Sequence, residues 1–261
     1  MTDRYDRQKS VPGFGDKGQE ALEKASVLII GAGGLGSPAS LYLAGAGVGK
    51  IGIVDGDTVN PTNLHRQILY DESLCGMNKA ECAAVRLERL NGGITVTPYP
   101  FMLDRENAYG IIRDYDIIID GCDNFPTRYL VSDICEAYGK PYIYGAVSDT
   151  CGYVSVLCHT DPAKGRMWTY RDLFPEADSG ASLDGSRETV HDCNKDTRET
   201  SHENNGKIAA AKAVLGPVPG ITGCCQAAEA IKLVCGLGSL LCGRLWIYDA
   251  LSGIANTIEL E

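Results

Sequence analysis

A short glycine motif constrains the fold of this 261-residue chain more than any other feature. The apolar run from Val27 to Ile30 leads directly into Gly31-Ala-Gly33-Gly34-Leu-Gly36, which fits the pattern G-x-G-x-x-G. Such glycines after a buried strand let the backbone approach a phosphate group, and the helix that follows supplies unpaired N–H groups. The motif predicts a strand, a tight turn and a helix that bind a nucleotide. The alternative is that the glycines only permit close packing.

Apolar runs and helical spacings alternate along the rest of the chain. We expect strands at 27–30, 51–54, 94–97, 117–119 and 142–144, and helices from near Leu35 and over 79–90, 105–113 and 128–138. This alternation is typical of α/β proteins with a Rossmann-like, doubly wound and mostly parallel sheet. A helix over 221–234 and strands at 153–157, 244–248 and 257–260 are expected to extend the sheet with antiparallel strands.

Composition excludes several classes of protein. Hydrophobic residues make up 44% and charged residues 22%, as in ordinary globular domains, and the net charge of −10 without a basic cluster argues against nucleic-acid or anionic-membrane binding. The uncharged stretch 26–49 is interrupted by glycines and a proline, so no membrane span is expected there. Eleven cysteines without a pairing rhythm and a polar N-terminus favour free thiols and a cytoplasmic location.

The whole chain, residues 1–261, is expected to form a single nucleotide-binding domain. Residues 177–206 are the exception to its globular composition, because they are rich in Asp, Ser, Thr, Glu, Asn and Gly and almost lack large apolar side chains. Such a segment cannot bury enough apolar surface to offset the entropy lost on ordering. We therefore expect a flexible, polar insert.

Polar and charged residues follow the second expected strand. The loop reads Asp55-Gly-Asp57-Thr-Val-Asn60-Pro-Thr-Asn63-Leu-His-Arg66-Gln67. Asp55 is placed to accept hydrogen bonds from ribose hydroxyls, and Arg66 can hold phosphate oxygens with two N–H groups. Lys79 opens the next helix, where its ammonium group suits a polyphosphate better than the helix dipole. The alternative for Lys79 is an ordinary solvated position.

A further carboxylate follows the fourth expected strand, in Asp120-Gly-Cys122-Asp123-Asn124. Asp123 is predicted to hold Mg²⁺, because this ion is commonly bound by one carboxylate together with phosphate oxygens and water. The alternative is that Asp123 only caps the helix that begins after it.

Together these residues resemble the ThiF/MoeB/HesA adenylyltransferases, which are related to the ubiquitin-activating enzymes. The resemblance also includes Arg4-Tyr-Asp-Arg7-Gln8, the segment 216–220 and the segment 245–252. It implies a homodimer that uses Mg²⁺ and ATP to adenylate the C-terminal Gly-Gly carboxylate of a small ubiquitin-like sulfur carrier. Such a carrier, ThiS-like or MoaD-like, would serve thiamine or molybdopterin biosynthesis, of which thiamine is slightly favoured.

The resemblance also assigns roles to individual residues. Arg7, reaching across the dimer, and Arg66, Lys79 and Asp123 are the expected catalytic residues, with Asp123 at the metal. The expected nucleotide-binding residues are Gly31, Gly33, Gly34, Gly36, Asp55, Asp57, Asn63, Arg66, Gln67, Lys79, Asp123 and Asn124. Because the carrier's carboxylate is already ionised, the reaction needs charge stabilisation and positioning rather than a side-chain nucleophile.

Two departures from the family leave other functions open. Many members hold Zn²⁺ with two Cys-x-x-Cys pairs, but here the first pair falls at Thr169-Tyr-Arg-Asp172 and no second pair follows, so no zinc is expected. Members that form a covalent carrier adduct have a cysteine where this chain has Ala209, and Cys193 is the remaining candidate. The alternatives are a regulatory or scaffold protein that only binds nucleotide, and an NAD-linked oxidoreductase.

Overall fold

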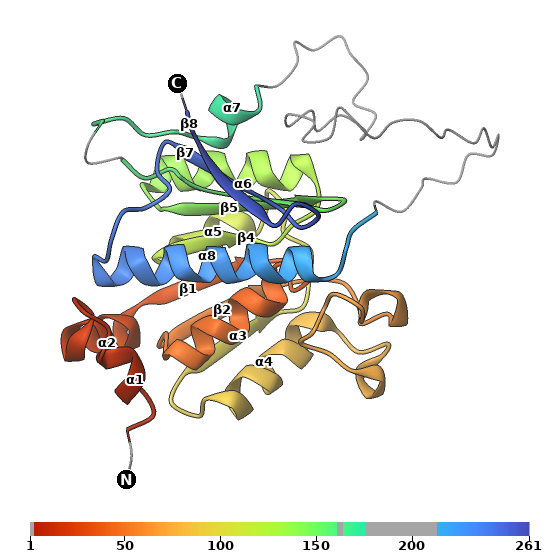
Figure 1. Ribbon diagram of the computed structural model, residues 1–261. Helices are drawn as coiled ribbons and strands as arrows, with labels where there is room; N and C mark the ends of the chain where they lie inside the picture. Colours follow the sequence, from red (N-terminus) through yellow and green to blue (C-terminus); the bar gives the residue numbers. More distant parts are fainter. Residues whose placement is uncertain (1–2, 161–163, 176–212, 261) are drawn as a thin grey trace, which may run out of the picture.

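The computed structural model describes residues 3–160, 164–175 and 213–260. The sheet lies between two layers of helices (Figure 1). Its strands are β1 (Ser26–Ile30), β2 (Lys50–Val54), β3 (Thr95–Tyr99), β4 (Ile117–Asp120), β5 (Tyr142–Ser148), β6 (Cys151–Leu157), β7 (Arg244–Asp249) and β8 (Ile254–Glu259). The α-helices are α1 (Asp6–Lys9), α2 (Gly15–Lys24), α3 (Gly36–Ala46), α4 (Lys79–Leu90), α5 (Ala108–Arg113), α6 (Phe125–Tyr138), α7 (Tyr170–Leu173) and α8 (Pro217–Cys235). Two 3₁₀ turns, η1 (Pro61–Asn63) and η2 (Glu72–Leu74), lie in the loop after β2.

The strand order β3-β2-β1-β4-β5-β6-β7-β8 confirms the predicted fold class. The first five strands pair in parallel, and β6, β7 and β8 continue the same sheet in antiparallel pairs. Because the chain passes from β1 to β2 on one side and β4 lies on the other side, the sheet has its switch point between β1 and β4. Ligands of doubly wound sheets bind at such a point, beyond the carboxyl ends of the strands.

Alternating side chains of the strands divide the core into two parts. Val27 and Ile29 of β1 face the layer that contains α2, α3, α4 and α8, whereas Leu28 and Ile30 face α5, α6 and α7. Both faces of the parallel strands are therefore buried, which explains their unbroken apolar sequences. β3 is an edge strand, so it tolerates Pro98, which has no N–H to donate.

The helices differ from the sequence prediction mainly at their starts. α4 matches the prediction from Lys79 to Leu90, but α6 begins at Phe125 and α8 at Pro217, in both cases beside a proline that is favourable in a first turn. α1, α2 and α7 were not predicted. α2 is nevertheless amphipathic, and it buries Gly18, Gln19 and Leu22 on one face.

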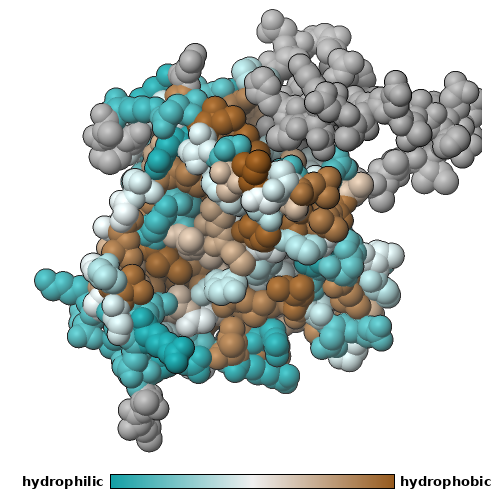
Figure 2. Space-filling view, viewed as in Figure 1, coloured by the Kyte–Doolittle hydropathy of each residue, from teal (hydrophilic) through white to brown (hydrophobic). Residues whose placement is uncertain are grey.

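One face of the molecule carries a broad apolar area. Figure 2 shows hydrophobic residues gathered over the face where Figure 1 shows α3, α8 and β8. Tyr42 of α3, Ile221 of α8, and Ile254 and Ile258 of β8 are exposed. Within the described ranges no helix is long and apolar enough to cross a membrane. The predicted insert 177–206, Cys193 and Ala209 lie outside the described residues.

Candidate functional site

The glycine motif forms a turn at the switch point that only glycine can occupy. Gly31 has a φ of +95°, and a β-carbon there would lie 2.4 Å from the carbonyl oxygen of Gly121, in the turn after β4. A β-carbon on Gly36 would lie 2.0 Å from the carbonyl oxygen of Gly31. Gly121 also donates its N–H to the carbonyl oxygen of Ile30, at 2.7 Å. The turns that follow β1 and β4 are thus in direct backbone contact, and α3 begins beside them.

Asp55 joins the glycine turn to the loop after β2. Its carboxylate accepts the N–H of Ala32 at 2.8 Å through one oxygen and the N–H of Asp57 at 2.9 Å through the other. Burial raises the pKa of the Asp55 carboxyl, an effect that the charge on Lys79 opposes. Each carboxylate oxygen retains a second lone pair, which is what a ribose hydroxyl would require.

Lys79 lies inside the site rather than on a solvated surface, so that alternative is wrong. The residue is only 5% exposed, and its Nζ lies 3.0 Å from Oδ2 of Asp57, whose side chain is 56% exposed. The backbone N–H of Lys79 donates to the carbonyl oxygen of Asp57 at 2.9 Å. A fixed cation is therefore placed at the start of α4 by a carboxylate that remains accessible to solvent.

Arg66 and Gln67 lie over the glycine turn. A β-carbon on Gly34 would come within 3.6 Å of Cδ of Arg66, and one on Gly33 within 3.5 Å of Nε2 of Gln67. Gln67 is buried, and within the described residues its Oε1 has no hydrogen-bond partner. The carbonyl oxygen of Asn63 accepts the N–H groups of both Arg66 and Gln67, which turns the loop back over the glycines.

The start of α8 closes the same region from a distant part of the sequence. A β-carbon on Gly34 would lie 3.0 Å from Cβ of Pro219. A β-carbon on Gly216 would lie 2.5 Å from the carbonyl oxygen of His65, in the loop after β2. The late glycine-proline segment therefore packs against two of the predicted nucleotide-binding loops.

Asp123 and Asn124 have different roles at the start of α6. Asn124 is the N-cap, because its Oδ1 accepts the N–H of Thr127 at 3.0 Å. Asp123 is exposed, and no hydrogen bond or ion pair with another described residue holds its carboxylate. The alternative in which Asp123 caps this helix is therefore wrong. A single accessible carboxylate beside a predicted phosphate site fits Mg²⁺, which takes oxygen ligands and keeps several waters.

Two buried charged residues beneath this turn escaped sequence analysis. Asp120, at the end of β4, is fully buried and lies 3.1 Å from Nε of Arg128 in α6. Asp120 also accepts hydrogen bonds from the N–H and the thiol of Cys122, whose pKa is raised by burial and by the charge of Asp120. The available signal was the position of Arg128 on the same helical face as Val131 and Cys135, which a solvated arginine would not occupy.

Arg7 lies at the other end of the fold from these residues. It is exposed in α1, where its neighbour Gln8 donates to the carbonyl oxygen of Ala46, the last residue of α3. Because α3 has 11 residues and begins at the glycine turn, its length places α1 about 16 Å from that turn. Figure 1 shows α1 and the loop after β2 at opposite ends of the helical layer. Arg7 is thus not brought to the site of its own chain.

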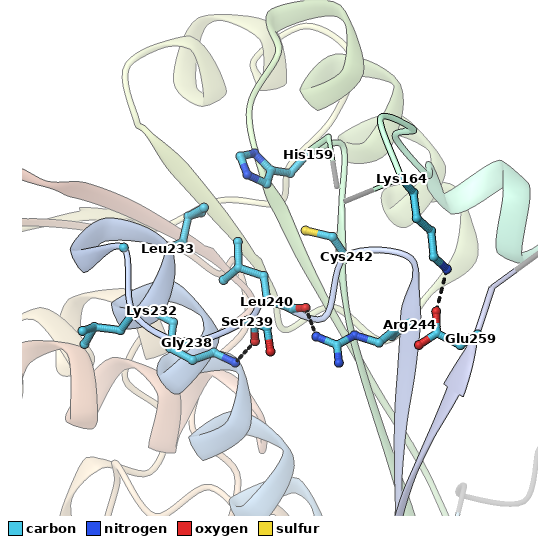
Figure 3. A pocket seen from close by; sticks show the side chains of 12 residues that line it. His159, Lys164, Lys232, Leu233, Gly238, Ser239, Leu240, Cys242, Arg244 and Glu259 are labelled. Carbon is cyan, nitrogen blue, oxygen red and sulfur yellow. Dashed lines mark hydrogen bonds and ion pairs between the residues drawn. The ribbon is translucent and has the colours of Figure 1, made fainter. Parts of the chain in front are cut away.

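A cavity of about 630 Å³ lies near the opposite end of α8 from this site (Figure 3). Its cationic side chains already have partners. Lys164 pairs with Glu259 at 2.5 Å, Lys232 donates to the carbonyl oxygen of Ser239 at 2.9 Å, and Arg244 donates to that of Leu240. None of the predicted site residues lines this cavity.

Backbone N–H groups at a glycine turn, with lysine and arginine beside them, are suited to the phosphates of a nucleotide. The fold and this turn define a doubly wound α/β protein of the nucleotide-binding type. The sequence pattern of the ThiF family matches residues 5–261, and the chain belongs to that family.

Named relatives agree with this assignment. The chain is 41% identical over 250 residues to the "Sulfur carrier protein adenylyltransferase" of Thermus thermophilus, covering 95% of this chain and 83% of that protein. It is 40% identical over 261 residues to the maize "Adenylyltransferase and sulfurtransferase MOCS3-1", covering all of this chain and 50% of the maize protein. The chain therefore spans about half the length of that relative.

Solved structures share the fold. The crystal structure of Escherichia coli MccB with AMPCPP and MccA superposes with a TM-score of 0.78 at 22% identity, over 99% of this chain and 72% of that one. The structure of MccB with ATP gives a TM-score of 0.77 at the same identity.

Proposed function

We propose that this chain is an ATP-dependent adenylyltransferase. Its substrate would be the C-terminal Gly-Gly carboxylate of a small ubiquitin-like sulfur carrier, ThiS-like or MoaD-like. The names of the Thermus and maize relatives support the activity. The structural observation that carries the proposal is the buried Lys79, held by Asp57 beside the glycine turn, with the exposed carboxylate of Asp123 in the adjoining turn.

The chemistry follows from the charges at this edge of the sheet. When the carrier's carboxylate attacks the α-phosphorus of ATP, negative charge accumulates on the phosphate oxygens. Lys79 and Arg66 would stabilise that charge, and Asp123 would hold the Mg²⁺ that shares it. Asp55 would accept hydrogen bonds from the ribose. No general base is required, because the attacking carboxylate is ionised at neutral pH.

ATP–pyrophosphate exchange tests the activity directly. Purified protein is incubated with ATP, Mg²⁺, labelled pyrophosphate and a ThiS-like or MoaD-like carrier, and the matched control is the same carrier without its final two glycines. We expect exchange only with the intact carrier. Nucleotide binding without exchange with either carrier would contradict the proposal and favour a regulatory or scaffold protein. Comparison of the two carriers tests the choice between thiamine and molybdopterin biosynthesis, which we place in the cytoplasm.

We also propose that the active form is a homodimer in which Arg7 serves the site of its partner. Two observations support this: the distance of α1 from its own chain's glycine turn, and the exposed apolar side chains over α3, α8 and β8 (Figure 2). Arg7→Ala and Asp123→Ala should each be inactive, whereas randomly mixed dimers should recover about a quarter of wild-type exchange, because half of the dimers have one intact site. No recovery would contradict action across the dimer.

The purified protein is expected to contain no stoichiometric zinc. At the position of the first zinc-binding pair, Oδ2 of Asp172 accepts the N–H and the hydroxyl of Thr169 at 2.7 and 2.9 Å, so these side chains bind each other. Over the described part of the chain, no group of three or more His, Cys, Asp or Glu residues is placed to hold a metal. Elemental analysis showing one zinc per chain would contradict this expectation.

A further inference from the structure

We propose that the buried pair Asp120–Arg128 positions the turn that presents Asp123, and thereby sets how strongly Mg²⁺ increases the affinity for ATP. Asp120 and Arg128 are then positioning residues, since both are buried and would act on the metal only through the turn that carries Asp123. The inference rests on the proposed function, because it concerns the metal of that same site.

The pair fixes the backbone on both sides of Cys122. Asp120 Oδ1 accepts the N–H of Cys122 at 3.0 Å, and Nη2 of Arg128 donates to the carbonyl oxygen of Cys122 at 2.9 Å. These two hydrogen bonds hold the peptide groups on either side of Cys122. The peptide group that follows Cys122 is the one that joins it to Asp123. Nε of Arg128 in turn donates to Oδ2 of Asp120. These contacts form one connected network, which fixes the position of the backbone at Asp123.

Arg128 also connects this turn to the next strand. Its Nη2 donates to the carbonyl oxygen of Gly145 in β5 at 3.3 Å, and its guanidinium group lies over the ring of Tyr144, 5.5 Å from the ring centre. Each of these contacts is with the turn, with the end of β4 or with β5. The arginine therefore connects the end of β4 and the turn after it to β5.

This connection is needed because the backbone pairing of β4 with β5 ends before the turn that carries Asp123. The register contains Ile118 opposite Tyr142 and Ile119 opposite Ile143. At the end of this register, Gln226 of α8 lies on the other face of the sheet. Its Nε2 donates to the carbonyl oxygens of Asp120, at 2.7 Å, and Ile143, at 3.0 Å. Side chains from both helical layers thus replace the backbone hydrogen bonds between β4 and β5 at the end of β4.

The stability of the fold does not by itself explain why a charged pair, Asp120 and Arg128, is buried here. Burial of two charges costs hydration, and an apolar pair of similar volume commonly stabilises a protein as well as a buried ion pair does. What an apolar pair cannot do is hold the N–H and the carbonyl of Cys122. The distinctive contribution of the charged pair is therefore the geometry of the turn.

The double variant Asp120→Leu/Arg128→Met separates positioning from stability, because it removes both charges and keeps apolar volume. Calorimetric titration with ATP, in Mg²⁺ and in EDTA, measures the gain in affinity that the metal provides. We expect the variant to fold, as checked by circular dichroism and thermal unfolding, and to bind metal-free ATP within about twofold of wild type. The factor by which Mg²⁺ increases its affinity for ATP should fall roughly 10-fold or more, as for loss of residues that orient metal ligands.

Two further variants make the result specific. Asp133→Leu/Arg171→Met removes a partly exposed pair, joined by two contacts of 2.8 Å, that links α6 to α7 away from the turn. This control should keep the wild-type gain from Mg²⁺. Asp123→Asn should lose the gain, and combining it with Asp120→Leu/Arg128→Met should cause no further loss, since both changes act on one ligand.

The outcomes distinguish this inference from the proposed function. A folded double variant with the wild-type gain from Mg²⁺ would overturn the inference, and so would a wild-type protein whose ATP affinity is the same in Mg²⁺ and EDTA. Because no carrier is present in these titrations, failure of carrier-dependent exchange counts only against the proposed activity.

Discussion

Two turns at the same edge of the sheet are built alike but neutralise their carboxylates differently. Asp55 directly follows β2 and Asp120 is the last residue of β4, and each accepts the N–H of the residue two positions later, at 2.9 and 3.0 Å. Asp120 has a buried arginine beside it, whereas the lysine near Asp55 pairs instead with Asp57. Burial therefore raises the pKa of Asp55. One turn contains an internal ion pair, whereas in the other the described residues give the carboxylate two backbone N–H donors and no side-chain donor.

The largest difference between the turns should appear in stability. Asp120→Asn removes the carboxylate charge that lies 3.1 Å from Nε of the buried Arg128, so the free energy of unfolding should fall by about 3–5 kcal/mol. Urea unfolding followed by circular dichroism measures this loss. A loss below about 1 kcal/mol would mean that Arg128 finds another partner and that the two turns are energetically alike.

The next effect concerns function rather than stability. Asp123→Asn should lower carrier-dependent pyrophosphate exchange by a factor on the order of 10² or more, because it removes the charge that holds Mg²⁺. The free energy of unfolding should stay within about 0.5 kcal/mol of wild type, since Asn124 and not Asp123 caps α6. A folded variant that exchanges at the wild-type rate would show that this turn does not serve the metal.

Asp55→Asn should have a smaller effect on stability than Asp120→Asn. The amide can accept only one of the two backbone N–H groups that the carboxylate accepts, but the change also removes a buried charge, so the net loss should be roughly 1 kcal/mol. The same urea unfolding experiment compares the two variants. An equal or larger loss for Asp55→Asn would remove the proposed difference between the turns.

The smallest effect is a dependence on pH. Because the pKa of Asp55 is higher in the folded chain than its ordinary value of 3.8, the folded state binds more protons in the interval between the two values. The stability of wild type relative to Asp55→Asn should therefore fall as the pH rises through that interval, and should be constant above it. Unfolding of both proteins over a series of pH values checks the sign. A relative stability that rises with pH would contradict the effect of burial.

Sequence patterns predicted the sheet better than they predicted the site. The centres of the strands were found because both faces of the parallel strands are buried. The glycine turn and the loop after β2 were located because their residue types have few other uses at that position. Their actual contacts with ATP remain a prediction.

Other features depend on contacts between distant residues and could not be read in this way. Arg128 is buried because Asp120, eight residues earlier, meets it across the β4 turn, and Gln226 reaches the same strand from α8. Lys79 is buried because the loop after β2 folds back upon it. Local patterns record the residue types in such a network but not the distances that make them partners.

The position of α1 has a consequence for how the protein would behave at different concentrations. With Arg7 remote from its own glycine turn, a single chain would lack one of the proposed phosphate-binding cations. Each site would then be completed only by association, so the turnover per chain would decline on dilution below the dissociation constant of the dimer. Synthesis of more chain would raise activity more than proportionally, and the amount of protein in the cell would itself regulate carrier activation.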